Sequence, residues 1–253
     1  MEEHAADPSH PRYRSLLMRH RLEIAAEKGM LADSALIAHG RGEAYDYLLD
    51  EKTSSSAHVA TQVALGALVN AQHPVLSVNR NVVALAGDEM LLLAAKLDCP
   101  LEVNIFYRTP ERMQALLSDL HERKTRLGID AEILGAEPDA TIPGLKGPRA
   151  KCESKGILQA DVILVPLEDG DRCEALVAMG KTVIVIDLNP LSRSARRGSI
   201  TIVDELTRCL ENMLSMDRTQ LPSLESYDHN QTLQDALNTI VDGMRNKFSD
   251  GKE

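Results

Sequence analysis

Residues 184–203 read IVIDLNPLSRSARRGSITIV, and this stretch decides the fold class. It continues an apolar, β-branched run that begins at Thr182, a composition typical of a strand buried in a parallel sheet. The run stops at Asp187, and Asn189-Pro190 ends any regular structure. A second β-branched run occupies residues 200–203. The stretch therefore predicts two buried strands of an open α/β sheet, joined by a polar loop.

The loop between these two strands is rich in arginine and serine. Its arginines stand at positions 193, 196 and 197, and its serines at 192, 194 and 199. Ligands of open α/β sheets bind beyond the carboxyl ends of the strands, and guanidinium and hydroxyl groups are good phosphate donors. A solvated surface loop would explain the same residues. The position between two buried strands of an acidic protein favours a phosphate receptor.

Apolar runs and helix signals alternate along the rest of the chain. We expect further strands at 74–78, 101–106, 131–134 and 160–165, with helices between them, and an irregular excursion over 136–157. This alternation predicts an α/β fold with a Rossmann-like parallel sheet flanked by helices. We expect one domain over 1–253, made of an N-terminal helical region 1–72, a core 73–206 and a C-terminal helical region 207–253.

Composition excludes several classes of protein. The chain has 253 residues, a formal net charge of −10, 3% aromatic residues and no Trp, which argues against a nucleic-acid partner. The four cysteines form no CxxC pair, so neither a zinc site nor a redox motif is predicted. No apolar run has transmembrane length, and the first residues lack the apolar core of a signal peptide. We expect a soluble, cytoplasmic protein with no membrane partner.

Polar residues cluster at several predicted element ends. His39 and Arg41 flank Gly40 in a Gly-x-Gly segment, whose glycines would let the backbone turn sharply and approach a ligand, although a lone Gly-x-Gly is a weak signal. A structural hydrogen bond would explain His39 as well as a ligand contact does. Asn79 and Asn81 follow a predicted strand, and they could form a turn or contact a polar substrate. Three carboxylates follow the strand at 160–165: Glu168, Asp169 and Asp171. Such residues could cap a helix, hold Mg²⁺ or orient an amine, and capping explains Asp171 most simply.

The sequence resembles the archaeal phosphopantothenate synthetases, also called 4-phosphopantoate–β-alanine ligases. The matching segments keep their order over nearly the whole chain; they are SHPRYRSL, LIAHGRGEAYDYL, PVLSVNRNVVAL, LEVNIFYRTPERM, ADVILVPLEDGDRCEALVAMGK and VIVIDLNPLSRSARRGSITIVDEL. The resemblance implies a step of coenzyme A biosynthesis. ATP would activate 4-phosphopantoate as an acyl-adenylate, and β-alanine would then attack to give 4'-phosphopantothenate and AMP. It also implies a homodimer and a requirement for Mg²⁺.

The resemblance assigns roles residue by residue. The positions that match ATP-binding residues of the family are Arg19, Arg41, Asp187, Leu188, Asn189, Arg193, Ser194, Glu205 and Leu206. From their place in the chain we expect Asn79, Asn81, Glu168 and Asp169 to contact substrate. We expect His39, Arg193 and Arg196 to act in catalysis, the arginines by offsetting the charge of two polyanions. The proton acceptor for β-alanine stays open among Glu168, Asp169 and His39.

The sequence departs from the family pattern at one position, and two other functions would also fit its residues. Arg80 stands where the family motif has a glycine, so a turn that needs a positive φ is in doubt, or a charge has been added near the substrate. A nucleotide-binding module without catalysis would leave ATP intact. A phospho-acid kinase would make ADP. The ligase alone would make AMP.

Overall fold

The core of the protein is a six-stranded, fully parallel sheet. The computed structural model describes residues 7–32 and 34–249. The strands run in the order β3-β2-β1-β6-β7-β8, and each pairs in parallel with its neighbours; their bounds are β1 Pro74–Val78, β2 Leu101–Val103, β3 Ile133–Leu134, β6 Val162–Pro166, β7 Thr182–Ile186 and β8 Ile200–Ile202. This order confirms the Rossmann-like prediction. The chain reverses direction across the sheet between β1 and β6, and ligands of such sheets bind at that switch point.

Successive residues of each strand supply two separate cores. In β1, Leu76 points into the larger core and Val75 into the smaller one, as the two-residue period of a strand requires. The larger core packs against α1 Tyr13–Glu27, α3 Ser55–Asn70, α4 Arg80–Leu97, α5 Pro110–Leu127 and α8 Leu206–Ser215. The smaller core packs against α6 Gly170–Ala178 and the segment that carries β4 Ala140–Thr141 and β5 Lys151–Cys152. Because the core strands are buried on both faces, their residues are apolar almost throughout.

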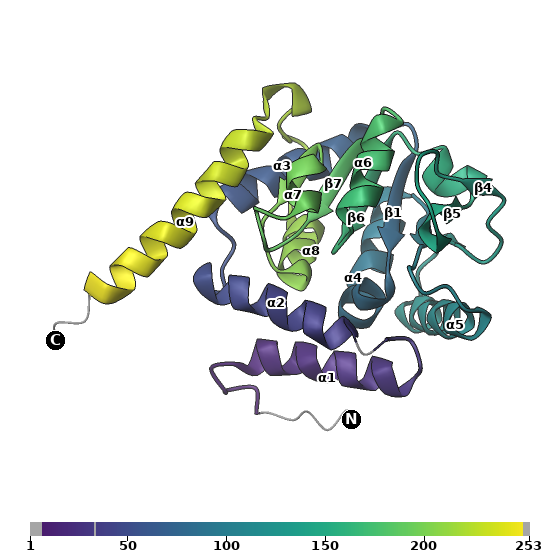
Figure 1. Ribbon diagram of the computed structural model, residues 1–253, viewed down its shortest axis with the longest axis horizontal. Helices are drawn as coiled ribbons and strands as arrows, with labels where there is room; N and C mark the ends of the chain where they lie inside the picture. Colours follow the sequence, from purple (N-terminus) through teal and green to yellow (C-terminus); the bar gives the residue numbers. More distant parts are fainter. Residues whose placement is uncertain (1–6, 33, 250–253) are drawn as a thin grey trace.

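Helices α1 and α2 (Ser34–Leu48) lie below the sheet in Figure 1, next to each other, and α9 (His229–Ser249) projects from the body as a long C-terminal helix. A third apolar cluster joins α9 to the sheet region, with Leu233 and Ile240 packing near Leu188 and Val203. The first turns of α9 therefore close the outer edge of the sheet.

Three expectations about local structure were wrong or incomplete. Gly40 and Gly42 do not form a turn, because α2 runs through both of them with no positive φ. The segment 136–157 is less irregular than expected, because β4 and β5 pair antiparallel, a short helix Pro148–Ala150 lies between them, and another, Ser154–Leu158, follows β5. The arginine-rich loop contains a short helix, α7 Arg193–Arg197, capped by the Ser192 hydroxyl, which accepts from the Ala195 amide at 3.0 Å.

Candidate active site

Two adjoining hollows open at the carboxyl edge of the sheet. The first, of about 320 Å³, lies between α1, α2 and the segments that follow β7 and β8. The second, of about 280 Å³, lies between the starts of α2 and α4 and the segments that follow β2 and β6. Ala38, Asn81 and Leu167 line both. The hollows therefore form one two-part cleft at the switch point between β1 and β6.

Asn79 connects the ends of β1 and β6. It is the N-cap of α4, where its side-chain oxygen accepts from the amides of Asn81 and Val82 at 3.0 and 3.1 Å. Its side-chain amide donates to the carbonyls of Pro166 and Leu167 at 3.2 and 2.9 Å. A carboxamide has two donors and two acceptor positions, and all are occupied. Of the two open readings, the structure supports turn formation for Asn79, and a direct substrate contact stays a prediction.

Asn81 is better placed than Asn79 to meet a ligand. Its amide makes one long bond, 3.3 Å, to the Ala35 carbonyl, and its side chain lines both hollows. The sequence gives Asn79 and Asn81 the same two possible roles. In the structure, Asn79 uses its side chain to hold the backbone, whereas Asn81 can still contact a ligand.

His39 faces the first hollow from the middle of α2. Its Nε2 atom is buried and, among the described residues, has no hydrogen-bond partner. Burial lowers the pKa of His39, and the nearby charges of Glu43 and Glu205 only partly oppose this effect. The imidazole is therefore neutral near pH 7 and can accept a proton at Nε2.

Arg19 and His39 both lie near the carboxylate of Glu43. Its guanidinium donates to Glu43 at 2.7 Å, and this contact is the main reason why the pKa of Arg19 is raised. Glu43 also accepts from the Ser15 hydroxyl, and its carboxylate lines the first hollow. An anionic ligand would have to share Arg19 with Glu43.

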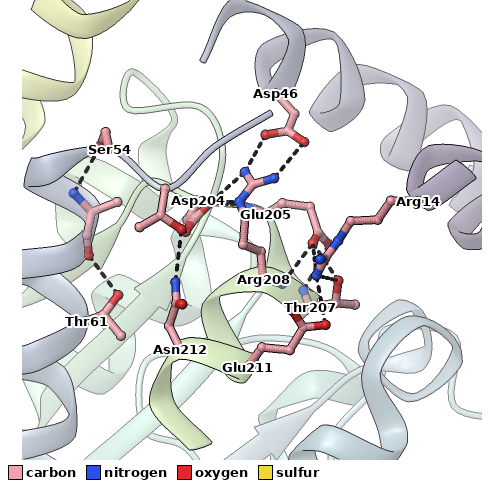
Figure 2. Close-up of polar contacts among 12 residues, drawn as sticks. Arg14, Asp46, Ser54, Thr61, Asp204, Glu205, Thr207, Arg208, Glu211 and Asn212 are labelled. Carbon is pink, nitrogen blue, oxygen red and sulfur yellow. Dashed lines mark hydrogen bonds and ion pairs between the residues drawn. The ribbon is translucent and has the colours of Figure 1, made fainter. Parts of the chain in front are cut away.

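The floor of the first hollow is a network of buried ion pairs (Figure 2). Arg208 lies between Asp46 of α2 and Asp204 after β8, with N···O distances of 2.6 Å to each. Arg14 of α1 donates to Thr207 at 2.9 Å and lies 3.8 Å from Glu205. The network thus fixes α1 and α2 to the end of β8 and the start of α8.

The predicted ATP residues after β7 and β8 border the first hollow. Leu188 and Leu206 line it, and Glu205 does so while capping α8, accepting from the amides of Thr207 and Arg208 at 2.9 and 3.0 Å. Gly42 lies against Leu188, since a Cβ built on that glycine would be 3.6 Å from Leu188 Cδ1. The glycine thus serves close packing of α2 over the β7 end, and the expected turn is not needed.

Asp187 and Asn189 shape the chain just after β7. The Asp187 carboxylate accepts from the Asn189 amide at 2.9 Å and from the Ser192 hydroxyl at 2.5 Å. Burial raises its pKa, and Arg41 is the nearby cation that opposes this effect. Arg41 and Asp187 are therefore close in space, although they are far apart in sequence.

The arginines of α7 point to α6 and line neither hollow. Arg193 is ion-paired with Asp171 and Glu174, and Arg197 lies 2.8 Å from Glu174, while Arg196 is exposed. The capping role expected for Asp171 is wrong, because Asp169 holds the N-cap position of α6 and Asp171 lies in its first turn. Exposed ion pairs are weak, so a ligand could recruit Arg193 at little cost. The catalytic roles of Arg193 and Arg196 stay predictions.

Glu168 and Ser194 are held by the fold. Glu168 is 8% exposed and forms ion pairs with Arg149 and Arg172, the latter fully buried. The Ser194 hydroxyl donates to the Glu168 carbonyl at 2.6 Å. Asp169 is more accessible: it accepts from Arg149 at 2.6 Å and lines the second hollow. Of the two carboxylates expected at the substrate, the structure presents Asp169.

The second hollow contains basic residues that the sequence did not single out. Arg149 lines it from the short helix before β5. Arg80, for which the sequence left open a lost turn or an added charge near the substrate, lines it from the first turn of α4. Arg80 has no positive φ, so the backbone there does not need a glycine. Arg149 carries no recognisable motif, and only the folded path of 136–157 brings it to the switch point.

Residues 7–32 and 34–249 contain no group of three or more His, Cys, Asp or Glu side chains placed to hold a metal ion. Within the same residues no helix is long and apolar enough to cross a membrane. The cytoplasmic location, like the division into three regions, stays a prediction.

The sheet order and the two-part cleft at its switch point define a Rossmann-like α/β protein, the class in which ligands bind at that point. The chain belongs to the family described as phosphopantothenate/pantothenate synthetase, whose sequence pattern matches residues 56–243. This membership confirms the resemblance that the motifs indicated.

Relatives match along almost their full length. The 4-phosphopantoate–β-alanine ligase of Thermococcus kodakarensis is 46% identical over 251 residues, which cover 96% of this chain and 95% of that protein. The protein of the same name from Thermococcus onnurineus is 47% identical over 251 residues, 96% of this chain and 94% of that protein. The one from Methanosarcina mazei is 44% identical over 244 residues, 93% of this chain and 94% of that protein.

Proposed function

We propose that this protein is an ATP-dependent ligase that joins 4-phosphopantoate to β-alanine in coenzyme A biosynthesis, releasing AMP and pyrophosphate. The observation that carries the proposal is the two-part cleft of a chain whose relatives bear this activity in their names. A reaction that couples a nucleotide to a second phosphorylated molecule needs two adjoining sites, since proximity and orientation supply much of the rate acceleration.

We assign the nucleotide to the first hollow. Leu188, Glu205 and Leu206 line it, and Arg19 donates a hydrogen bond to Glu43, which also lines it. Its apolar lining suits a base, and Glu205 can accept hydrogen bonds from sugar hydroxyls. Three of the nine residues predicted for ATP, Leu188, Glu205 and Leu206, thus support this assignment, whereas Arg193 and Ser194 do not line the hollow.

We assign 4-phosphopantoate to the second hollow, which Asn81 and Asp169 line. The junction at Ala38, Asn81 and Leu167 would place the carboxylate of the acid next to the α-phosphate of ATP. A carboxylate oxygen attacks the α-phosphorus, the bond to the β-phosphate oxygen breaks, and pyrophosphate leaves. The amine of β-alanine then attacks the acyl carbon, and AMP leaves with the bonding electrons.

His39 is our candidate for the base that takes the proton from β-alanine. It is neutral at pH 7, it lines the first hollow, and its buried Nε2 atom has no hydrogen-bond partner among the described residues. Glu168 is less suitable, because its buried carboxylate is already paired with Arg149 and Arg172. Asp169 remains a second candidate.

Mg²⁺ is proposed to enter the cleft with ATP. Proteins usually bind this ion through one or two carboxylates together with substrate phosphates, and its chemistry here would be to neutralise the triphosphate. Asp169, whose side chain is 63% exposed beside the second hollow, is a carboxylate that fits this role.

A homodimer is proposed through one apolar face of α2 and α9. Ile37 is 70% exposed and Leu36 47%, and Leu48, Val241 and Met244 are also exposed. The two helices touch where Leu48 and Gly243 meet. A face of this kind on a monomer marks a contact surface. Light scattering should give a dimer for the wild type and a monomer for Ile37→Glu; a wild-type monomer would refute the dimer.

One assay tests the activity. The protein is incubated with ATP, Mg²⁺, 4-phosphopantoate and β-alanine, and the nucleotide product is identified. AMP and 4'-phosphopantothenate in equal amounts are expected, and omission of β-alanine should prevent the amide product. ADP would show a kinase, and unchanged ATP would show a binding module, so either result would refute the ligase.

A further inference from the structure

The second hollow is the place where positive charge concentrates in this acidic protein. Arg80 and Arg149 line it, and Arg112 lies close enough to Arg80 to act on its charge. Among the described residues that line it, Asp169 is the single carboxylate, and Arg149 already binds it. The hollow thus carries an excess of cationic groups.

The neighbours of Arg80 hold it through a hydroxyl and an aromatic ring, and Asp169 acts on its charge only from a distance. Its guanidinium donates to the Ser34 hydroxyl at 3.2 Å and lies 5.2 Å from the ring centre of Tyr107. No carboxylate of the described residues lies within 4 Å of it. A stacked, hydrogen-bonded guanidinium has its direction fixed while other N–H groups stay available for a ligand.

Two further guanidiniums have unused donors. The Nε atoms of Arg112 and Arg149 are buried and have no partner among the described residues, although Arg112 also donates from Nη1 to the Tyr107 carbonyl at 3.0 Å. Arg149 is only 7% exposed. Buried N–H groups without a partner are costly, so the one on Arg149, which lines the hollow, favours an anion that accepts from it, and Arg112 adds positive charge from behind Arg80.

The charges also act on one another. Burial lowers the pKa of Arg80, and the nearby guanidiniums of Arg112 and Arg149 lower it further. An entering dianion relieves this repulsion.

We propose that Arg80, with Arg149 and Arg112, binds the phosphate group of the phosphorylated acid and so makes the enzyme select the phosphorylated acid over its unphosphorylated form. The identity of the acid depends on the proposed function, whereas the site for a phosphate group does not. The assignment also orients the acid: its phosphate lies beside Arg80, and its carboxylate points toward the junction at Asn81.

Binding without turnover tests the site directly. Calorimetry with 4-phosphopantoate, with pantoate and with inorganic phosphate is done on the full chain without nucleotide. We compare the wild type with Arg80→Gln and Arg80→Lys. The control is Arg126→Gln, which removes an exposed arginine that pairs with Asp88 from the last turn of α5. Melting temperature and circular dichroism report whether each variant is folded.

Arg80→Gln is expected to weaken binding of 4-phosphopantoate about 10- to 100-fold, the range of a lost charge-assisted hydrogen bond, and to leave the weak binding of pantoate unchanged. Arg80→Lys should restore part of the affinity, and the control should bind as the wild type does. Equal affinity of Arg80→Gln and wild type for 4-phosphopantoate would overturn the proposal. If Arg80→Gln does not fold, Arg80→Lys carries the test, and unchanged affinity for 4-phosphopantoate in that variant counts against the site.

Steady-state kinetics separates the two possible sources of the phosphate. Arg80→Gln should raise KM for 4-phosphopantoate at least about tenfold and change KM for ATP less than about threefold. The opposite pattern would place a phosphate of ATP beside Arg80 and overturn the assignment. A wild type that binds 4-phosphopantoate through Arg80 but forms no AMP would refute the ligase and leave the phosphate site standing.

Discussion

Arg208 provides the sharpest test of how the cleft is built. Its side chain is 12% exposed and shared by Asp46 and Asp204, whose side chains are 12% and 0% exposed. The Arg208→Met variant keeps a side chain of comparable length but removes the charge. Two buried carboxylates then lose their common cation, and α2 loses its connection to α8 (Figure 2).

The expected loss of stability follows from these contacts. Two opposite charges about 4 Å apart attract by about 4 kcal/mol at an effective dielectric constant of about 20, and part of this energy offsets the desolvation of Arg208. Removing one partner of a buried pair costs about 3–5 kcal/mol. Asp204 keeps its bonds from the Thr53 hydroxyl at 2.6 Å and the Glu205 amide at 2.8 Å. We therefore expect a free energy of unfolding lower by about 3–4 kcal/mol at pH 8.

Urea denaturation at pH 5 and pH 8 checks the value and its origin. Burial raises the pKa of Asp204, and Arg208 opposes this rise, so without Arg208 the pKa of Asp204 in the folded state is higher still. Stability is then lost as pH rises through that window, and the deficit must be smaller at pH 5. Arg245→Met is the control, since its pair with Asp242 is exposed at 75% and 66% and should change stability by less than about 0.5 kcal/mol. A deficit below about 1 kcal/mol for Arg208→Met, or one equal at both pH values, would refute the reasoning.

Three further predictions follow from buried groups. Burial raises the pKa of Glu102 to about 7, so the free energy of unfolding should fall by up to about 3 kcal/mol between pH 5 and pH 8. Urea titrations of Glu102→Gln should show a smaller fall over the same pH range, and an unchanged fall would contradict this prediction. His39→Asn should lower kcat about 100-fold or more and remove the acid limb of the profile of rate against pH. In the wild type this limb lies below pH 6.5, because burial lowers the pKa of His39. A variant that keeps the acid limb would show that another residue is the base. The four cysteines are buried, and burial raises the pKa of Cys99 to about 12 and that of Cys152 to about 11, so a disulfide reagent should modify no thiol until urea unfolds the chain; rapid labelling of the native protein contradicts their burial.

The strands of the sheet could be read from the sequence because each is a short apolar run with its own boundaries. All six expected runs form strands of the parallel sheet, with ends shifted by up to a few residues. The pairing of β4 with β5 was missed, since each is only two residues long and neither Ala140–Thr141 nor Lys151–Cys152 has a strand pattern. Such short strands depend on the neighbouring fold, which local pattern does not encode.

The helix through Gly40 and Gly42 shows the opposite limit. Glycine is a poor helix former, so the segment suggested a turn. Tertiary contacts overrode that preference: Asp46 is bound by Arg208, and Leu188 packs at Gly42. Propensity is a weak guide wherever a helix lies over the end of a sheet and needs small residues for close approach.

For the site, the sequence indicated the positions at strand ends but not their partners. Asn81, Leu188 and Glu205 follow strands, and the carboxyl edge of a parallel sheet brings such residues together whatever their separation in the chain. Arg149 could not be predicted, because it follows no strand of the main sheet. The pairing of Arg193 with α6 was also out of reach, since any acidic side chain could have taken that arginine.

The difference in charge between the two hollows sets the direction in which a nucleotide can lie. Glu43, Asp46 and Glu205 border the first hollow, and they would repel a triphosphate but accept hydrogen bonds from a ribose or a base amine. Two arginines also line the first hollow, but Arg14 pairs with Glu205 and Glu211 and Arg208 with Asp46 and Asp204, whereas Arg80 in the second hollow has no such ion pair among the described residues. The proposed ligase must therefore bind ATP with its sugar among the carboxylates and its phosphates at the junction. That orientation brings the α-phosphate to Asn81, where an acid anchored at Arg80 presents its carboxylate.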